Sequence, residues 1–206
     1  MQRVWAGLAT LGVACGAMAQ VTSLFSIPVA DTKGVREVEI GYFLSGNERN
    51  IDKSYSHYGY GVLGIHERVE VAASTDFVGG SAWGFKVKFL DDPKGKYALS
   101  GGFQNIVGRN SDPYIVGRYD FEKFRVHGGW YRNDRSRVIL GVDFGLSEEL
   151  SVAVDHYSGD GGTTWGGFFY VVPGIDGLTA AVFVGVPNNK ADGVQHSIGL
   201  LYGFRF

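Results

Sequence analysis

The sequence predicts an all-β fold of about twelve antiparallel strands. Apolar residues alternate with small or polar ones along most of the chain, which is the period of two of a strand with unlike faces. Glycine is frequent, at 32 of 206 residues, and each interior Gly would cost a helix about 1 kcal/mol relative to Ala. No run of about 18 apolar residues occurs, so we expect no spanning helix.

Residues 193–206 show the alternation most clearly. Every second position is apolar, and the last three of these are aromatic: Ile198, Leu200, Tyr202, Phe204 and Phe206. The pattern resembles the closing strand of bacterial outer-membrane β-barrels, whose C-terminal Phe and alternating apolar residues are read by the barrel-assembly machinery. The alternative is an edge or core strand of a secreted β-sandwich.

That resemblance implies an antiparallel up-and-down transmembrane β-barrel, porin-like, in the outer membrane of a Gram-negative-type envelope. One face of each strand would then contact lipid and the other would face an enclosed lumen. It also implies an assembly signal made of Tyr202, Phe204 and Phe206. The expected partners are outer-membrane lipid, the assembly machinery and small solutes.

Residues 1–19 are interpreted as a secretory signal peptide. Arg3 gives a positive start, an apolar stretch follows, and Ala17-Met18-Ala19 has the form of a cleavage site. The alternative is lipidation at Cys15, although Gly12 stands where such a site usually has Leu. Because Cys15 is the single Cys, the mature chain is expected to have no thiol and no disulfide.

Residues 20–34 do not fit a central strand, because Pro28 cannot donate a hydrogen bond to a neighbouring strand. Residues 31–34 have the composition of a turn. We expect this N-terminal segment to lie in the lumen or at the periplasmic mouth. Pairing as an edge strand is the alternative.

From residue 35 to residue 206 the chain alternates strand and turn, which predicts a single barrel domain. The expected strands are 35–45, 55–65, 69–76, 82–90, 96–105, 113–121, 124–132, 137–146, 150–158, 164–172, 177–186 and 193–206. An even number places both ends of the barrel on one side, expected to be the periplasm. The turns on the opposite side are only slightly longer, so no large extracellular binding loop is expected.

The polar face of each strand predicts the lumen. The predicted pore-lining residues are Glu37, Glu39, Glu70, Lys86, Lys88, Lys96, Arg118, Asp120, Arg125, His127, Asp143 and Asp155. Acidic and basic residues are partly segregated along the chain, although its net charge is only −2. Opposed charged walls would create a field that selects small polar or ionic solutes. Alternatively, the charges pair with one another and fill a narrow, plugged lumen.

These observations favour a small passive channel, with a structural barrel and a lipid-modifying enzyme as alternatives. The enzyme would need His57, His156 and His196, which fall near the outer rim. Each of these histidines points to the opposite face from its neighbours along the strand, so it forms no catalytic pair with them. No catalytic residue, metal, cofactor or nucleic acid is predicted. Eight aromatic residues are interpreted as interfacial girdles: Tyr42, Tyr58, Tyr60, Trp83, Tyr119, Trp130, Trp165 and Tyr202.

Overall fold

The structure is a computed structural model, and it describes residues 21–47 and 55–206. The predicted signal peptide, its cleavage site and Cys15 lie outside the described residues. Within the described ranges, no helix is long and apolar enough to cross a membrane.

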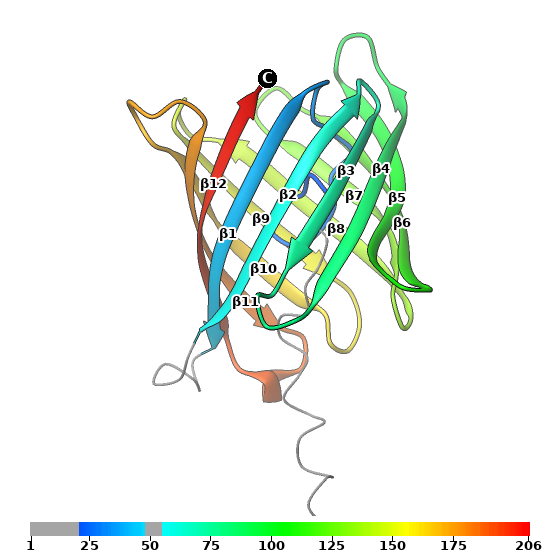
Figure 1. Ribbon diagram of the computed structural model, residues 1–206, viewed down its shortest axis with the longest axis vertical. Coiled ribbons are helices and arrows are strands. Elements are labelled where there is room, and N and C mark those ends of the chain that lie inside the picture. Colours follow the sequence, from blue (N-terminus) through cyan, green and yellow to red (C-terminus); the bar gives the residue numbers. More distant parts are fainter. Residues whose placement is uncertain (1–20, 48–54) are drawn as a thin grey trace, which may run out of the picture.

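Twelve antiparallel strands form one closed barrel (Figure 1). They are β1 (Glu37–Asn47), β2 (Ser56–His66), β3 (Val69–Thr75), β4 (Ser81–Asp91), β5 (Tyr97–Val107), β6 (Asn110–Asp120), β7 (Arg125–Arg132), β8 (Ser136–Gly145), β9 (Leu150–Tyr157), β10 (Thr163–Val171), β11 (Leu178–Pro187) and β12 (Gln195–Arg205). A 3-10 turn, η2 (Lys190–Asp192), precedes β12. The predicted fold class is confirmed.

The barrel closes where β1 pairs with β12, from Glu37 opposite Arg205 to Asn47 opposite Gln195. The amide of Phe206 also donates to the carbonyl of Arg36, at 3.3 Å, so the two ends of the barrel sequence lie side by side. We call this end of the barrel, which holds the turns 67–68, 92–96, 121–124, 146–149 and 172–177, the C-terminal mouth. The opposite end is the distal mouth.

Strand boundaries differ from the predicted ones by a few residues, and the largest difference has a local cause. β6 begins at Asn110, three residues before the predicted start, because Gly108 has a positive φ of 60° and reverses the chain in a tight turn. A loop was expected there. β3 ends at Thr75, one residue early, because the Asp76 carboxylate accepts from the amides of Val78 and Gly80 and closes the next loop.

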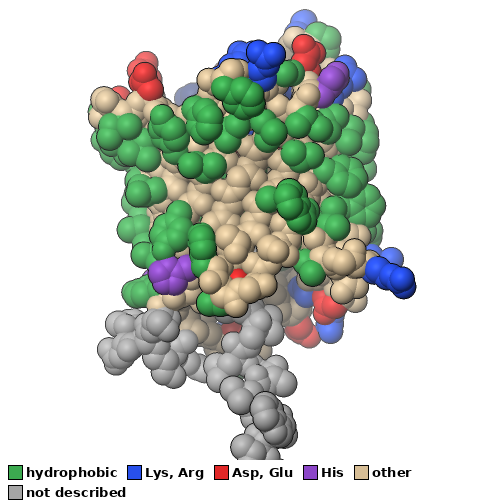
Figure 2. Space-filling view, viewed as in Figure 1, with side chains coloured by type: hydrophobic (Ala, Val, Ile, Leu, Met, Phe, Trp, Pro, Cys, Tyr) green, Lys and Arg blue, Asp and Glu red, His purple; other side chains and the backbone are tan. Residues whose placement is uncertain are grey.

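The outward face of the barrel is apolar. Ile198 and Leu200 of β12 are 55% and 54% exposed, and hydrophobic side chains cover the sides of the barrel in Figure 2 while charged ones gather at its ends. A surface this apolar is stable in contact with lipid and unstable in water. The alternation therefore places a lipid-facing band around the molecule.

Of the eight aromatic residues interpreted as girdles, five face outward, as a girdle requires, and three do not. Trp83 is 63% exposed, and Tyr42, Tyr119, Trp130 and Tyr202 also face outward. Tyr58 is only 8% exposed, and Tyr60 and Trp165 line the interior with it. The three errors share one cause: these residues have the inward parity of their strands, which position near a strand end does not reveal.

Candidate functional site: the barrel lumen

The N-terminal segment, residues 21–34, lies inside the barrel (Figure 1). It folds back on itself as a small hairpin: the Leu24 amide donates to the Ile27 carbonyl and the Val29 amide to the Thr22 carbonyl, both at 3.1 Å. Val21, Ile27 and Ala30 are almost fully buried there. The segment pairs with itself and does not extend the sheet as an edge strand.

Glu70 of β3 and Lys86 of β4 hold the base of this hairpin. Their side chains are fully buried and form an ion pair of 3.0 Å. The Glu70 carboxylate also accepts from the Thr22 amide at 2.6 Å and from the Lys33 amide at 2.8 Å. Lys86 Nζ donates to the carbonyls of Thr22 and Val29, at 2.9 and 3.0 Å. The pair therefore binds four backbone groups at the base of the segment: the amides of Thr22 and Lys33 and the carbonyls of Thr22 and Val29.

Asp155 of β9 holds the tip of the hairpin. Its carboxylate accepts from the amides of Phe25, Ser26 and Ile27, at 2.9, 2.7 and 3.3 Å, and from Ser26 Oγ at 2.8 Å. The Tyr157 hydroxyl donates to the Ser26 carbonyl at 2.9 Å. Both residues lie in the half of β9 nearer the distal mouth, so the segment spans much of the lumen.

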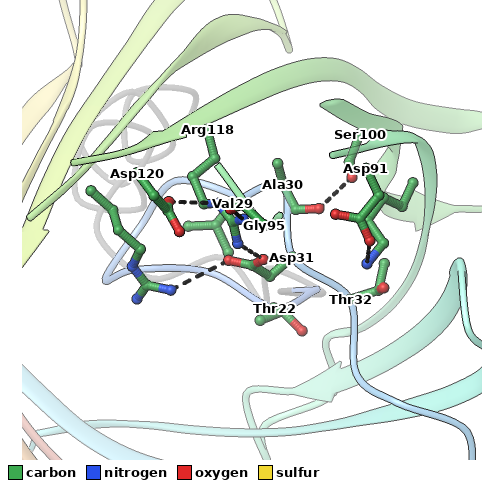
Figure 3. A network of polar contacts seen from close by, with 12 residues as sticks. Thr22, Val29, Ala30, Asp31, Thr32, Asp91, Gly95, Ser100, Arg118 and Asp120 are labelled. Atoms are coloured by element: carbon green, nitrogen blue, oxygen red, sulfur yellow. Dashed lines mark hydrogen bonds and ion pairs between the residues drawn. The ribbon is translucent and has the colours of Figure 1, made fainter. Parts of the chain in front are cut away.

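Arg118 and Asp31 anchor the segment near the C-terminal mouth (Figure 3). Arg118 contacts Asp31 directly, lies 2.9 Å from Asp120 and donates to the Gly95 carbonyl at 2.7 Å. Ser100 Oγ donates to the Ala30 carbonyl, also drawn in Figure 3. The β6 cation thus links the barrel wall, a turn and the segment.

The remaining predicted lumenal charges, apart from Lys96, also have neighbours. The Asp143 carboxylate lies 2.7 Å from Arg125 Nη2 and 2.7 Å from His127 Nε2. Also near the C-terminal mouth, Glu39 pairs with Lys33 at 2.6 Å, Lys88 with Asp91 at 2.8 Å, and Glu37 accepts from the Gly34 amide at 2.7 Å. Lys96 lies in the turn before β5 and is exposed. These contacts give the charges a structural role that alternation alone did not show.

Glycines in the wall make room for the segment. A Cβ on Gly64 of β2 would lie 2.0 Å from the Gly34 carbonyl oxygen, and one on Gly141 of β8 would lie within 2.8 Å of Leu24 and Ile27. Real Cβ atoms do not approach other atoms this closely. The wall is therefore shaped to receive the segment.

A cavity of about 610 Å³ remains on the other side of the lumen. Most of its wall comes from β1, β2 and β9–β12, Tyr131 of β7 and Arg137 of β8 also line it, and the segment forms its inner side. Gly177 and Gly203 line it near the C-terminal mouth, and Asn133 and Gly161 line it near the distal mouth. We call this cavity the free passage, a name for the cavity alone, because residues from both ends of the barrel line it.

Aromatic rings line the middle of the free passage. Phe25 of the segment lies 5.0 Å from Phe169 and 4.2 Å from Phe183, between ring centroids. Phe183 is 5.5 Å from Phe43, whose ring is nearly parallel to that of Tyr60, at an interplanar angle of 11°. Sequence reasoning missed these lumenal rings, although strand parity could have found them.

Arg137 of β8 lies at the distal mouth of the passage. Its guanidinium donates to Asn133 Oδ1 and to the carbonyls of Ser158 and Asp160, at 3.1, 3.1 and 2.9 Å. It also contacts Asp134, outside the strands. Burial raises the pKa of that carboxyl, but hydrogen bonds and charge from Arg137 and Arg135 outweigh burial and hold the pKa below its usual value. Arg137 therefore uses most of its N–H donors to hold the two loops that follow β7 and β9.

The histidines of the predicted rim do not form one cluster. His57 Nδ1 contacts the Tyr42 hydroxyl, His156 Nδ1 lies 2.9 Å from Thr164 Oγ1, and His196 meets the edge of the Tyr55 ring. Among the residues that the structure describes, no group of three or more His, Cys, Asp or Glu could hold a metal ion.

No family model matches the chain, and no curated protein matches it. Among solved structures it is similar to the KdgM porin, with 13% identity and a TM-score of 0.57 over 81% of this chain and 99% of that one. It is likewise similar to the KdgM porin in complex with disordered oligogalacturonate, with 12% identity and a TM-score of 0.58 over the same shares. The chain therefore has a porin-like transmembrane β-barrel fold, of no specified family.

Proposed function

We propose that this protein is an outer-membrane channel that lets small solutes pass along the free passage, beside the N-terminal segment. The observation that carries the proposal is the cavity of about 610 Å³, whose lining residues come from both ends of the strands. The apolar exterior and the fold shared with porins support the location. Tyr202, Phe204 and Phe206 as a signal for the assembly machinery stay a prediction.

In this proposal the charges in the lumen bind other groups of the protein and do not create a field across an open pore. Glu70, Lys86 and Asp155 bind the segment, and Asp143 binds neighbours in the wall. Selection by a transverse field therefore stays a prediction that these contacts do not favour. A passage beside a fixed segment selects first by size.

A structural barrel with a plugged lumen is the second candidate, and the buried segment favours it. Rings of Phe25, Phe169 and Phe183 meet in mid-lumen, where they narrow the passage. The two candidates share every contact in the wall and differ only in whether ions cross at rest.

Planar-bilayer recordings of the purified protein separate the candidates. A channel gives small, reproducible conductance steps, and Asp155→Ala increases them because it releases the tip of the segment. The plugged barrel is silent until that substitution is made. Silence of both proteins, each shown to be folded by its heat-dependent mobility on a gel, would eliminate the channel.

A further inference from the structure

Three rings of the free passage lie over glycines of the neighbouring strand. Trp165 is paired with Gly185, Phe43 with Gly199 and Tyr60 with Gly41. In each pair the ring occupies the space that a Cβ on the glycine would take, with ring atoms 2.8, 2.1 and 2.2 Å from that position. One part of each ring therefore rests on the wall.

Not all of these rings are equally accessible. Phe43 is buried, whereas Tyr60, Trp165 and Phe169 are only partly buried and line the passage. These three residues, which we call the ring surface, are held by different strands: β2 and β10. Phe169 stacks on Phe25 and Tyr60 stacks on Phe43, so each of these two rings already has a ring partner. The parts of Tyr60, Phe169 and above all Trp165 that face the passage form a surface on which another flat, weakly polar group can stack.

The passage carries little charge. Among the described residues that line it, only Glu39 and Arg137 are charged. Glu39 is occupied by Lys33 and by the Tyr60 hydroxyl, and Arg137 by its loop. An anion on the ring surface would lose its hydration without gaining a counter-charge, which is costly.

Hydroxyl and amide groups flank the ring surface toward both mouths. Ser45, Thr163, Gln195 and Ser197 line the passage on the distal side, and Ser151 and Thr179 line it on the other side. A pocket with an apolar middle and a few polar groups is typical of a small-molecule site, and about 610 Å³ lies within the usual size range.

We propose that the ring surface binds short uncharged saccharides as they pass through the channel. A sugar ring presents C–H groups on its faces and hydroxyls around its edge. The C–H groups, with partial positive charge, suit the negative face of an aromatic ring, and the edge hydroxyls suit the flanking Ser, Thr and Gln side chains. The inference deepens the proposed function and rests on it for passage, but the binding itself does not require conductance.

The test compares three probes on the folded, full-length protein in detergent and in planar bilayers. Maltotriose is uncharged, trigalacturonate is an anionic saccharide of the same length, and benzyl alcohol is an aromatic compound without a sugar ring. Calorimetry measures binding in detergent, and partial block of the current measures it in the bilayer. We expect saturable binding of maltotriose, with trigalacturonate at least about tenfold weaker because its charge is not matched.

Variants locate the site. Trp165→Leu removes one ring of the ring surface and should weaken maltotriose binding about fivefold to tenfold, while Trp165→Phe keeps a ring and most of the affinity. The matched control is Trp83→Leu, because Trp83 faces outward and should leave binding unchanged. If Trp165→Leu does not fold, Phe169→Leu tests the same surface.

Three results would overturn the inference: trigalacturonate or benzyl alcohol binding as tightly as maltotriose, no binding of maltotriose, or equal binding by the folded Trp165→Leu and wild-type proteins. Conductance without saccharide binding would reject this inference and leave the channel intact. Saccharide binding in detergent without conductance would reject the channel and support the binding surface.

Discussion

At the scale of single residues, the ion pair of Glu70 and Lys86 shows why charged residues stay inside this barrel. Neither side chain is exposed, so each has lost its hydration. The pair offsets that loss only because it also binds backbone groups at Thr22 and Val29. The charges thus position the segment as well as each other.

Lys86→Met should destabilise the folded barrel by about 3–5 kcal/mol, since it leaves the Glu70 carboxylate buried without a counter-charge. Urea unfolding of protein refolded into lipid vesicles measures the loss. The matched control is Lys88→Met, because Lys88 pairs with the partly exposed Asp91 near the mouth and should cost less than about 1 kcal/mol. Equal losses in the two variants would contradict the role given to the buried pair.

The glycines beside lumenal rings act at the same scale. Gly185, Gly199 and Gly41 are each paired with an aromatic residue whose ring takes the place of a side chain. A larger residue there would push the ring toward the passage. The glycine content that excluded helices in the sequence therefore has a second role in shaping the lumen.

At the scale of elements, the N-terminal segment is the part of the chain that sets the width of the lumen. Its hairpin is too short to be stable alone, and it is held by side chains of β3, β4, β5, β6 and β9. Gly64 and Gly141 make room for it. Its position thus depends on the closed barrel around it.

Asp155→Ala should loosen the segment, because it removes the acceptor of four hydrogen bonds at residues 25–27. The reporter is Ile27→Cys, whose side chain is fully buried at the tip. We expect its labelling by a water-soluble maleimide to be slow in the parent protein. Labelling should be at least about tenfold faster with Asp155→Ala, since each hydrogen bond to a charged group contributes about 1.5–3 kcal/mol.

Asp76→Asn is the control for this experiment. Asp76 accepts only within its own loop at the distal mouth, so the same kind of change there should leave the labelling rate as in the parent. If Asp155→Ala does not change the rate either, the segment is held by its other contacts and Asp155 has no anchoring role.

At the scale of the whole molecule, the barrel separates an apolar exterior from a polar and aromatic interior. Closure between β1 and β12 satisfies the edge groups that an open sheet would expose to lipid. Trp83 and Tyr202 lie outside, while Tyr58 and Trp165 lie inside. Trp and Tyr residues therefore occur on both the outer and the inner surface of the barrel.

Leu200→Arg should cost about 2–4 kcal/mol in lipid vesicles, because Leu200 faces outward near the middle of β12. Val186→Arg, also outward but near the distal end of β11, should cost about 0–1 kcal/mol. Urea titration of both refolded variants gives the two free energies of unfolding. A cost that does not depend on depth would argue against a lipid-facing band.

Much of this architecture could be predicted from the order of the residues. Alternation over β12 and the turns between strands predicted twelve strands, and the structure has them within a few residues. The inward position of Glu70, Lys86 and Asp155 follows from parity alone. Local sequence contains this information because neighbouring residues of a strand must face opposite sides.

The sequence by itself determined the strands, their inward and outward faces and the even count, since each depends on period two and on turn residues near one another in the chain. Only the tertiary structure decided which charges pair, where residues 21–34 lie and which side of the lumen holds the cavity. Thr22 is 48 residues from Glu70, and Ser26 is 129 residues from Asp155. Contacts over such separations exist only once twelve strands have closed into a ring and enclosed the chain's own beginning.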